Sequence, residues 1–259
     1  MMLVRVETDA RGVATLTLAR ADKHNALSAD LIADLHAAAL ALGDDPQVRV
    51  VVLAADGPTF CAGGDLGWMR GQMAADAATR RAGAEAIAAM LGALNSLPKP
   101  VIGRVQGNAF GGGVGLACVC DVALTVDGAM FGLTETRLGL IPATIGPYVI
   151  ARMGEARARQ VFMSSRRFGA AEAQSLGIVA RVVAADDLDP AVEAEVAPYL
   201  ECAPGAVAAA KALAQRLGAG IDADAVAHSI NALIAQWEGD EAPEGIAAFF
   251  EKRKARWMI

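Results

Sequence analysis

The chain has 259 residues, of which 54% are hydrophobic and 20% are charged, and its formal net charge is -6. A chain of this length can bury a substantial core, as one large domain or as a domain with an appendage. The acidic balance argues against nucleic acid as the main partner, because phosphate backbones are bound by clustered lysine and arginine. No apolar run approaches the roughly 18 uncharged residues of a membrane helix, and the first residues already alternate like a strand. We therefore expect no membrane segment, no signal peptide and a cytoplasmic protein.

The cysteines and histidines exclude several familiar kinds of site. The four cysteines are spaced for neither a zinc site nor a disulfide framework, so we expect reduced thiols at Cys61, Cys118, Cys120 and Cys202. Three histidines and the lack of a Gly-x-Ser-x-Gly elbow argue against a serine hydrolase. Cys61 lies inside a glycine-rich turn, but nothing near it in sequence would activate a thiolate, and we expect it to pack.

The first hundred residues predict a hairpin, a helix and a buried strand. Residues 3–6 and 13–18 alternate apolar and polar side chains, which is typical of a β-hairpin. Ser28 is a good N-cap for a helix running to about residue 42. Residues 48–54 are almost all apolar, which predicts a strand buried on both faces. A glycine-rich turn at 60–65 and a long helical stretch to about residue 95 follow.

The same order of strand, glycine turn and helix then occurs a second time. We expect a strand at 101–105, a turn at 110–115, a short helix from 114 to 118 and a strand at 121–126. From residue 143 the pattern is mostly helical, with one strand at 178–183, and the chain ends in helices from about residue 204. The sequence therefore predicts an α/β core followed by a helical C-terminal region.

A strand that runs through glycines into a helix leaves the first helical N–H groups unpaired at the positive end of the helix dipole. Two such turns brought together can each direct one N–H at the same oxygen and stabilise an oxyanion. Three consecutive glycines also suit a simple tight turn. A dinucleotide site and a phosphate-binding P-loop fit less well, because the glycine spacing and the Gly-Lys-Ser/Thr signature are missing. Spacing alone leaves the oxyanion site and the tight turn open.

Motifs along almost the whole chain resemble the crotonase, or enoyl-CoA hydratase/isomerase, family. They include Phe-Cys-Ala-Gly-Gly-Asp-Leu in the first turn and Gly-Asn-Ala-Phe-Gly-Gly-Gly in the second, and their order and spacing are specific. The matching segments are 23–27, 60–66, 98–100, 107–113, 120–121, 131–135, 138–142, 170–173, 177–179 and 251–253.

The resemblance implies a spiral of ββα units over residues 1–200 and a helical oligomerisation region over 201–259. It implies an acyl-CoA thioester as substrate, no separate cofactor or metal, and a homotrimer or a dimer of trimers. The two oxyanion-hole N–H groups map onto Gly64 and Gly112. The segments lining the CoA groove contain Lys23, Ala26, Ala62, Asp65 and Leu66, and Lys252 is placed to approach the nucleotide phosphates or to be an ordinary solvated charge.

One departure from the family pattern concerns catalysis. The best-known hydratases of this family use two glutamates, of which the second maps onto Glu135 and the first onto Gly115. Glu135 is therefore the candidate general acid/base, with a structural role at the start of a helix as the alternative. Burial beside a thioester is expected to raise its pKa toward neutrality.

Three reactions fit a single glutamate: hydration or dehydration by Glu135 alone, Δ3,Δ2-enoyl-CoA isomerisation, and a reaction in which the substrate supplies the missing acid. The sequence around both turns resembles bacterial hydratases of branched glutaconyl-CoA esters in leucine and terpene degradation, which favours the first or third. We hypothesise that Gly115 opens space for such a substrate.

Further side chains are candidates for contacts with the acyl group. Arg70 and Arg137 are candidate partners for a distal carboxylate, and Trp68 and Met69 are candidates for the acyl pocket or for helix packing. A catalytically silent scaffold or RNA-binding relative is the alternative of another class. The retained Glu135 and the acidic charge weigh against it.

Overall fold

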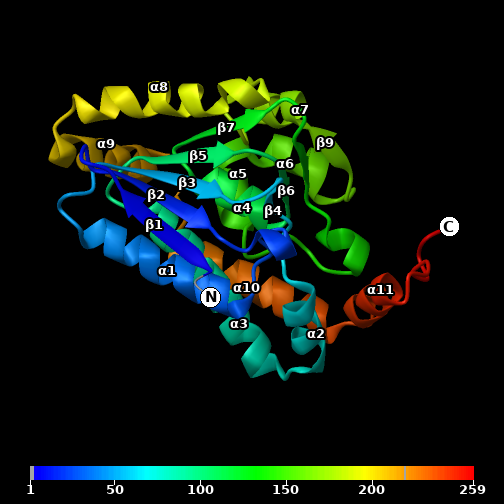
Figure 1. Cartoon of the computed structure of the whole chain (residues 1–259). Helices are drawn as coiled ribbons and strands as arrows, with labels where there is room; N and C mark the ends of the chain where they lie inside the picture. The colour runs from blue at the N-terminus through cyan, green and yellow to red at the C-terminus, as the bar shows by residue number, and fades with distance from the viewer. Residues whose placement is uncertain (1–2, 219) are drawn as a thin grey trace.

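The computed structural model describes residues 3–218 and 220–259, and two β-sheets form its centre. The larger sheet has the strand order β1-β2-β3-β5-β7-β10 (Figure 1). Its strands are β1 Val4–Thr8, β2 Val13–Leu18, β3 Val50–Ala55, β5 Val101–Val105, β7 Val122–Val126 and β10 Arg181–Val183. β1 and β2 form the predicted antiparallel hairpin, whereas the other neighbours pair in parallel. Every residue of β3 is buried, as predicted for a strand covered on both faces.

The smaller sheet is built from strands of three residues each. Its order is β4-β6-β8-β9, with β4 Thr59–Cys61, β6 Asn108–Phe110, β8 Met130–Gly132 and β9 Arg167–Gly169. β4, β6 and β8 are parallel, and β9 is antiparallel to β8. The sequence did not predict this sheet. Its place matters, because β4 and β6 lead directly into the two glycine turns.

Helices cover both faces of the larger sheet. The α-helices are α1 Ala29–Asp44, α2 Leu66–Ala74, α3 Ala77–Asn95, α4 Gly112–Val119, α5 Gly146–Met153, α6 Glu155–Phe162, α7 Ala170–Ser175, α8 Leu188–Leu200, α9 Pro204–Leu217, α10 Ala223–Glu238 and α11 Glu241–Phe250. Short 3-10 helices are η1 Ala21–Lys23, η2 Glu135–Leu138 and η3 Ala185–Asp187. Figure 1 shows α8 along one side of the sheet and α1 along the other.

Capping side chains fix the starts of α1 and α3. Ser28 Oγ accepts a hydrogen bond from the Leu31 N–H at 3.3 Å, which confirms the predicted start of α1. The long helical stretch predicted up to residue 95 is two helices, because Asp76 begins a new one by accepting from the Thr79 N–H at 2.8 Å. The break lets α2, which directly follows the first glycine turn, take a different direction from α3.

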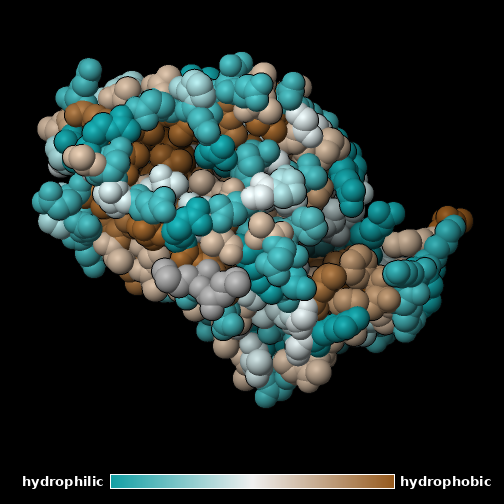
Figure 2. Space-filling view, in the orientation of Figure 1, coloured by the Kyte–Doolittle hydropathy of each residue, from teal (hydrophilic) through white to brown (hydrophobic). Residues whose placement is uncertain are grey.

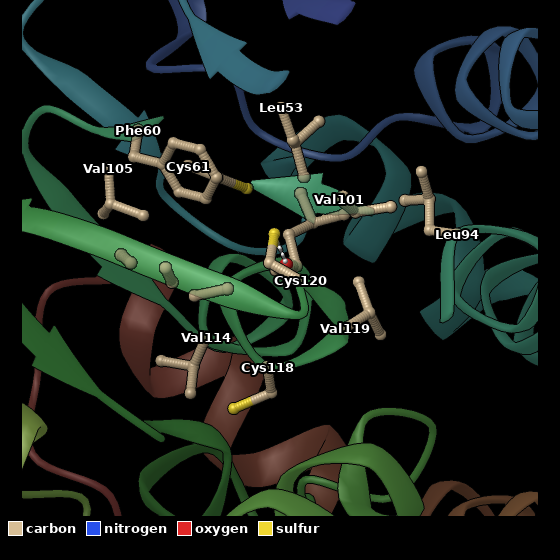
Figure 3. Close-up of a cluster of buried hydrophobic side chains, with 14 of the residues drawn as sticks. Leu53, Phe60, Cys61, Leu94, Val101, Val105, Val114, Cys118, Val119 and Cys120 are labelled. Atoms are coloured by element: carbon tan, nitrogen blue, oxygen red, sulfur yellow. Dashed lines mark hydrogen bonds between the residues drawn. The ribbon is translucent and has the colours of Figure 1, made fainter. Parts of the chain in front are cut away.

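The main core joins buried side chains of both sheets to those of α1, α3, α4 and α8, and Phe60 and Phe131 are among its largest fully buried side chains. Figure 3 shows Phe60 and Cys61 of β4, and Cys118 and Cys120 from α4 and its end, among the side chains of this core. Burial raises the pKa of the Cys61 thiol to about 12, and the same cause raises the pKa of Cys118 and of Cys120 to about 12. These thiols stay protonated near neutrality and act as packing residues, as predicted for Cys61.

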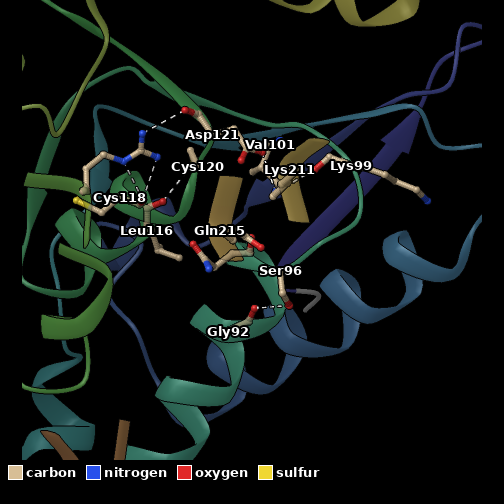
Figure 4. Close-up of polar contacts among 12 residues, drawn as sticks. Gly92, Ser96, Lys99, Val101, Leu116, Cys118, Cys120, Asp121, Lys211 and Gln215 are labelled. Carbon is tan, nitrogen blue, oxygen red and sulfur yellow. Dashed lines mark hydrogen bonds and ion pairs between the residues drawn. The ribbon is translucent and has the colours of Figure 1, made fainter. Parts of the chain in front are cut away.

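The C-terminal helices contact the core at defined points. Lys211 of α9 donates to Asp121 Oδ2 at 2.8 Å and to the Lys99 carbonyl at 3.1 Å (Figure 4). Asp121 Oδ2 also accepts from the Val101 N–H at 2.7 Å, so this contact joins α9 to strand β5.

α11 and the residues after it extend to one side of the body, and hydrophobic residues lie in the recess between them (Figures 1 and 2). Within the part of the chain described, no helix has the length and apolar character needed to cross a membrane.

Candidate active site

The two glycine turns lie against each other, and their glycines are required by close backbone approach. Gly63 has φ of 91°, and a Cβ there would lie 3.0 Å from the Phe110 carbonyl oxygen of the other turn. A Cβ at Gly113 would lie 2.4 Å from the Cys61 carbonyl oxygen. Only glycine allows these distances without moving the backbone. These close contacts between the backbones of the two turns fix the turns relative to each other.

Each turn has a backbone N–H group that donates no hydrogen bond within the described part of the chain. Leu27 bridges the first turn by donating to the Gly63 carbonyl at 2.7 Å and accepting from the Asp65 N–H at 3.0 Å. In a parallel bridge this leaves the peptide groups of the residue between, Gly64, directed away from Leu27. Gly112 is the first residue of α4, where a helix has no internal acceptor for its N–H. Among residues 3–218 and 220–259, neither N–H has a backbone acceptor.

Both glycines line a cavity of about 1220 Å³ that reaches from the glycine turns to the C-terminal segment. One wall is apolar and includes Trp68, Met69, Ile87 and Ile145. The lining also includes the cationic residues Arg137, Arg166, Arg167, Lys252, Arg253 and Lys254, and Glu135 is the one acidic residue among the described lining residues. Arg166 is paired with Glu172, and Arg253 with Glu244 and Glu251, which leaves four cationic lining residues without an ion pair in the part of the chain described. An acidic protein thus has a local positive field at this cavity, which suits an anionic ligand with an apolar end.

Glu135 is the first residue of η2, and its carboxylate lies against the second glycine turn. A Cβ at Gly111 would lie 2.9 Å from Glu135 Oε1. The residue as a whole is half-buried, but its Oε2 is buried and has no hydrogen-bond partner among the described residues. Burial raises the pKa of Glu135 to about 7, against a small opposing effect of its own backbone N–H. A carboxylate with that pKa can take up and return a proton near neutrality.

Comparison with known proteins identifies the family. Residues 8–258 match the family model described as Enoyl-CoA hydratase/isomerase. The chain belongs to the enoyl-CoA hydratase/isomerase family. The probable enoyl-CoA hydratase echA8 of Mycobacterium bovis is 33% identical over 251 residues, which cover 96% of this chain and 95% of that protein.

Solved structures of the same family superpose over nearly the whole chain. An enoyl-CoA hydratase from Shewanella pealeana is 36% identical, with a TM-score of 0.81, and the match covers 99% of this chain and 96% of that one. A putative enoyl-CoA hydratase from Mycobacterium avium paratuberculosis is 33% identical, with a TM-score of 0.87 and full coverage of both chains. The predicted α/β crotonase fold and the helical C-terminal region are confirmed.

Within this family, a hydratase with two glutamates would carry the first one at Gly115, and here the structure corrects the sequence hypothesis. The space beside Gly115 is filled, because a Cβ there would lie 2.5 Å from Ile145 Cγ2 and 3.0 Å from Ile145 Cβ. Ile145 is 3% exposed and lines the cavity, whereas Gly115 does not. Gly115 therefore opens no room for a substrate branch. It makes room for an isoleucine, and the wall there is apolar.

The other predicted binding residues divide into two groups. Ala62, Leu66 and Trp68 line the cavity beside the glycine turns, and Lys23, Ala26 and Asp65 are not among its lining residues. The Asp65 side chain caps α2 by accepting from the Trp68 N–H at 3.0 Å, and it pairs with Arg20 at 2.8 Å. These structural contacts account for the Asp65 carboxylate.

The candidate arginines also differ. The Arg70 guanidinium lies 4.0 Å from the centre of the Phe250 ring and is not among the cavity-lining residues. Arg137 lines the cavity and has no ion-pair partner among the described residues. Lys252 also lines it. Ile145, Arg166 and Arg167 also line the cavity, and the sequence did not indicate them because no local motif links them to the glycine turns.

Proposed function

We propose that this protein adds water reversibly to the 2,3 double bond of an acyl-CoA thioester, with Gly64 and Gly112 binding the thioester oxygen and Glu135 as the acid/base. The observation that carries the proposal is a carboxylate whose buried Oε2 has no hydrogen-bond partner among the described residues. It lies against two glycine turns, each with one backbone N–H that has no acceptor in the same described part of the chain. Family membership supports the substrate class and the reaction type.

The proposed reaction needs one carboxylate and two donors. Glu135 takes a proton from water as the water oxygen forms a bond to C3 of the substrate. The electrons of the 2,3 double bond move to the thioester oxygen, where the N–H groups of Gly64 and Gly112 stabilise the enolate. Glu135 then returns the proton to C2, so that one molecule of water is added and the carboxylate is restored. Its pKa of about 7 suits both transfers.

Coenzyme A enters as part of the substrate, and we propose no separate cofactor or metal. The cationic lining at Arg167 and Lys252 supports binding of its phosphates. A homotrimer or a dimer of trimers stays a proposal from the family resemblance. So do the contacts of CoA with the segments at Lys23 and Ala26.

For the acyl group we propose a branched, glutaconyl-like chain that carries a second carboxylate. The support is the resemblance of the segments around the glycine turns and Glu135, together with Arg137, an exposed cavity residue available to a distal carboxylate. The space at Gly115 no longer contributes to this proposal, since Ile145 fills it.

A second candidate is Δ3,Δ2-enoyl-CoA isomerisation, and one observation favours it. A water molecule held for attack needs two to four polar partners. Where two-glutamate hydratases have their first carboxylate, this chain has Ile145. A single carboxylate facing an apolar wall can still move a proton from C4 to C2, which needs no water.

The test compares three substrates with purified protein: crotonyl-CoA, 3-methylglutaconyl-CoA and a 3-enoyl-CoA. Hydration removes the absorbance of the conjugated enone thioester, whereas isomerisation of the 3-enoyl-CoA creates it. We expect loss of absorbance, faster with 3-methylglutaconyl-CoA. A clear preference for crotonyl-CoA would refute the branched substrate, and activity on the 3-enoyl-CoA alone would replace hydratase by isomerase. No turnover of any of the three, with Glu135→Gln indistinguishable from wild type, would indicate a silent scaffold.

A further inference from the structure

The 3-10 turn that carries Glu135 touches α11 backbone to backbone. A Cβ at Gly139, which ends η2 with φ of 71°, would lie 2.4 Å from the carbonyl carbon and oxygen of Glu241. On the opposite side of the contact, a Cβ at Gly245 would lie 2.5 Å from the Leu138 carbonyl carbon and 2.6 Å from its oxygen. Distances this short exclude any side chain at either position unless a backbone moves. One glycine on each segment thus makes the contact possible.

This contact belongs to a hydrophobic cluster separate from the main core. The cluster joins Met69 of α2, Leu140 after η2, Trp237 of α10, and Ala242 and Ile246 of α11. Ala242 and Ile246 are fully buried in it. Leu138 and Leu140, which follow Glu135, are therefore packed in the cluster that contains α11 and Trp237 of α10.

The position of the carboxylate depends on this turn, because little else holds it. Glu135 Oε2 has no hydrogen-bond partner among the described residues, so side-chain bonds do not fix that oxygen. The Glu135 carbonyl accepts from the Leu140 N–H at 3.1 Å, which ties the residue to the segment packed on α11. On its other side, η2 is held by Ser165 Oγ, which accepts from the Arg137 N–H at 2.9 Å and lies 2.6 Å from Thr136 Oγ1.

From this geometry we propose that Gly245, together with Gly139, is a positioning residue for the reaction. By letting α11 sit directly on η2, it holds the Glu135 carboxylate buried against the glycine turns. The inference rests on the proposed role of Glu135 as the acid/base. It assigns to the C-terminal helix a part in proton transfer, in addition to its part in forming the wall of the cavity.

The test is Gly245→Ala, compared with Gly71→Ala. Both glycines lie inside helices, but no described residue has an atom within 4 Å of a Cβ at Gly71, so the control adds the same methyl group in open space. A displacement of the order of 1 Å at a reacting group can cost about 100-fold in rate. We expect kcat of Gly245→Ala to fall about 10- to 100-fold on the better of crotonyl-CoA and 3-methylglutaconyl-CoA, with KM changed much less. The midpoint of its pH–rate profile should move below that of wild type, because the carboxylate becomes less buried.

A gentler variant covers the case in which Gly245→Ala does not fold. Ala242→Gly removes a buried methyl group at the same contact, and its control is Ala82→Gly, an exposed position in α3 with the same change in helix propensity. We expect Ala242→Gly to lower kcat about threefold and to shift the pH midpoint in the same direction, while Ala82→Gly leaves both unchanged.

The outcomes separate this inference from the proposed function. If Glu135→Gln is inactive while folded Gly245→Ala and Ala242→Gly keep the wild-type kcat and pH midpoint, Gly245 has no positioning role and the acid/base assignment stands. If Glu135→Gln keeps wild-type activity, the proposed function itself is wrong. A loss of kcat in Gly245→Ala with an unmoved pH midpoint would show a structural effect only and would overturn the inference.

Discussion

The two halves of the active site are built by different parts of the molecule. The oxyanion-binding half consists of backbone at the ends of β4 and β6, and its geometry is enforced by glycines in contact with the main core. The acid/base half is one side chain on a four-residue 3-10 turn, packed on α11 and joined to the C-terminal cluster. The first half depends on local sterics, whereas the second depends on a helix from the far end of the chain. Substitutions in the two halves should therefore affect catalysis in different ways.

The largest effect is expected from Glu135→Gln, which keeps the shape of the side chain and removes its proton chemistry. General acid/base catalysis contributes about 100- to 10,000-fold, and we expect kcat to fall by that factor with KM little changed. Steady-state kinetics on the better substrate measure it. Retention of more than a tenth of the wild-type kcat would remove Glu135 from its role.

The oxyanion-binding half is tested by Gly112→Pro, which deletes the N–H at the first residue of α4, where proline suits the helix. Loss of one oxyanion donor costs about 100- to 1,000-fold in kcat. Gly112→Ala is the matched control, since it keeps the N–H. Its Cβ would approach Leu27 Cδ1 at 2.5 Å, which is the movable end of a side chain. We expect Gly112→Ala to lose less than about tenfold, and equal losses in the two variants would contradict the assigned donor.

The pH dependence of the wild-type enzyme follows from the pKa of Glu135, which burial raises to about 7. The reaction starts from the carboxylate, so kcat/KM should rise with pH and level off above about 8. One percent of the group is ionised two pH units below its pKa, and the rate at pH 5 should be about 100-fold lower. Unfolding measured over the same range excludes loss of structure as the cause. A profile that is flat from pH 5 to 8 would show that Glu135 does not titrate as proposed.

The smallest effects concern the apolar wall at Ile145. Gly115→Glu forces a side chain into the space that Ile145 fills, and Ile145→Ala alone leaves a cavity costing about 2–5 kcal/mol. In the double variant, the side chain added at position 115 fills part of the space left by the shortened side chain at position 145. We expect its loss in unfolding free energy to be about 1–3 kcal/mol smaller than the sum of the single losses. Urea unfolding measures the three variants, and additive losses would show that the two residues do not share this space.

The sequence was a good guide wherever the signal was local. The hairpin, the buried strand β3, the cap at Ser28 and both glycine turns follow from patterns a few residues long. Glu135 was predicted as the acid/base from its match to a motif of the family. The strands of the smaller sheet were missed because three residues are too few for an alternating pattern to stand out.

Contacts between distant segments could not be predicted. A side chain at position 115 of α4 would occupy the space that Ile145 fills at the start of α5. Nothing in the sequence at either position indicates the other. The hypothesis of an open space at Gly115 failed for that reason. Gly139 and Gly245 likewise belong to no motif in the sequence. Only the packing of α11 on η2 shows why glycine is needed at both positions.

The most direct test of the division into two halves is the carbonyl stretching frequency of a bound enoyl-CoA thioester, measured by Raman or infrared difference spectroscopy. Hydrogen bonds to the thioester oxygen lower this frequency. In Glu135→Gln the frequency should be lowered as in wild type although turnover is lost, and in Gly112→Pro the lowering should largely disappear. A shift that vanishes in Glu135→Gln, or persists unchanged in Gly112→Pro, would contradict a carbonyl polarised by the glycine turns independently of Glu135.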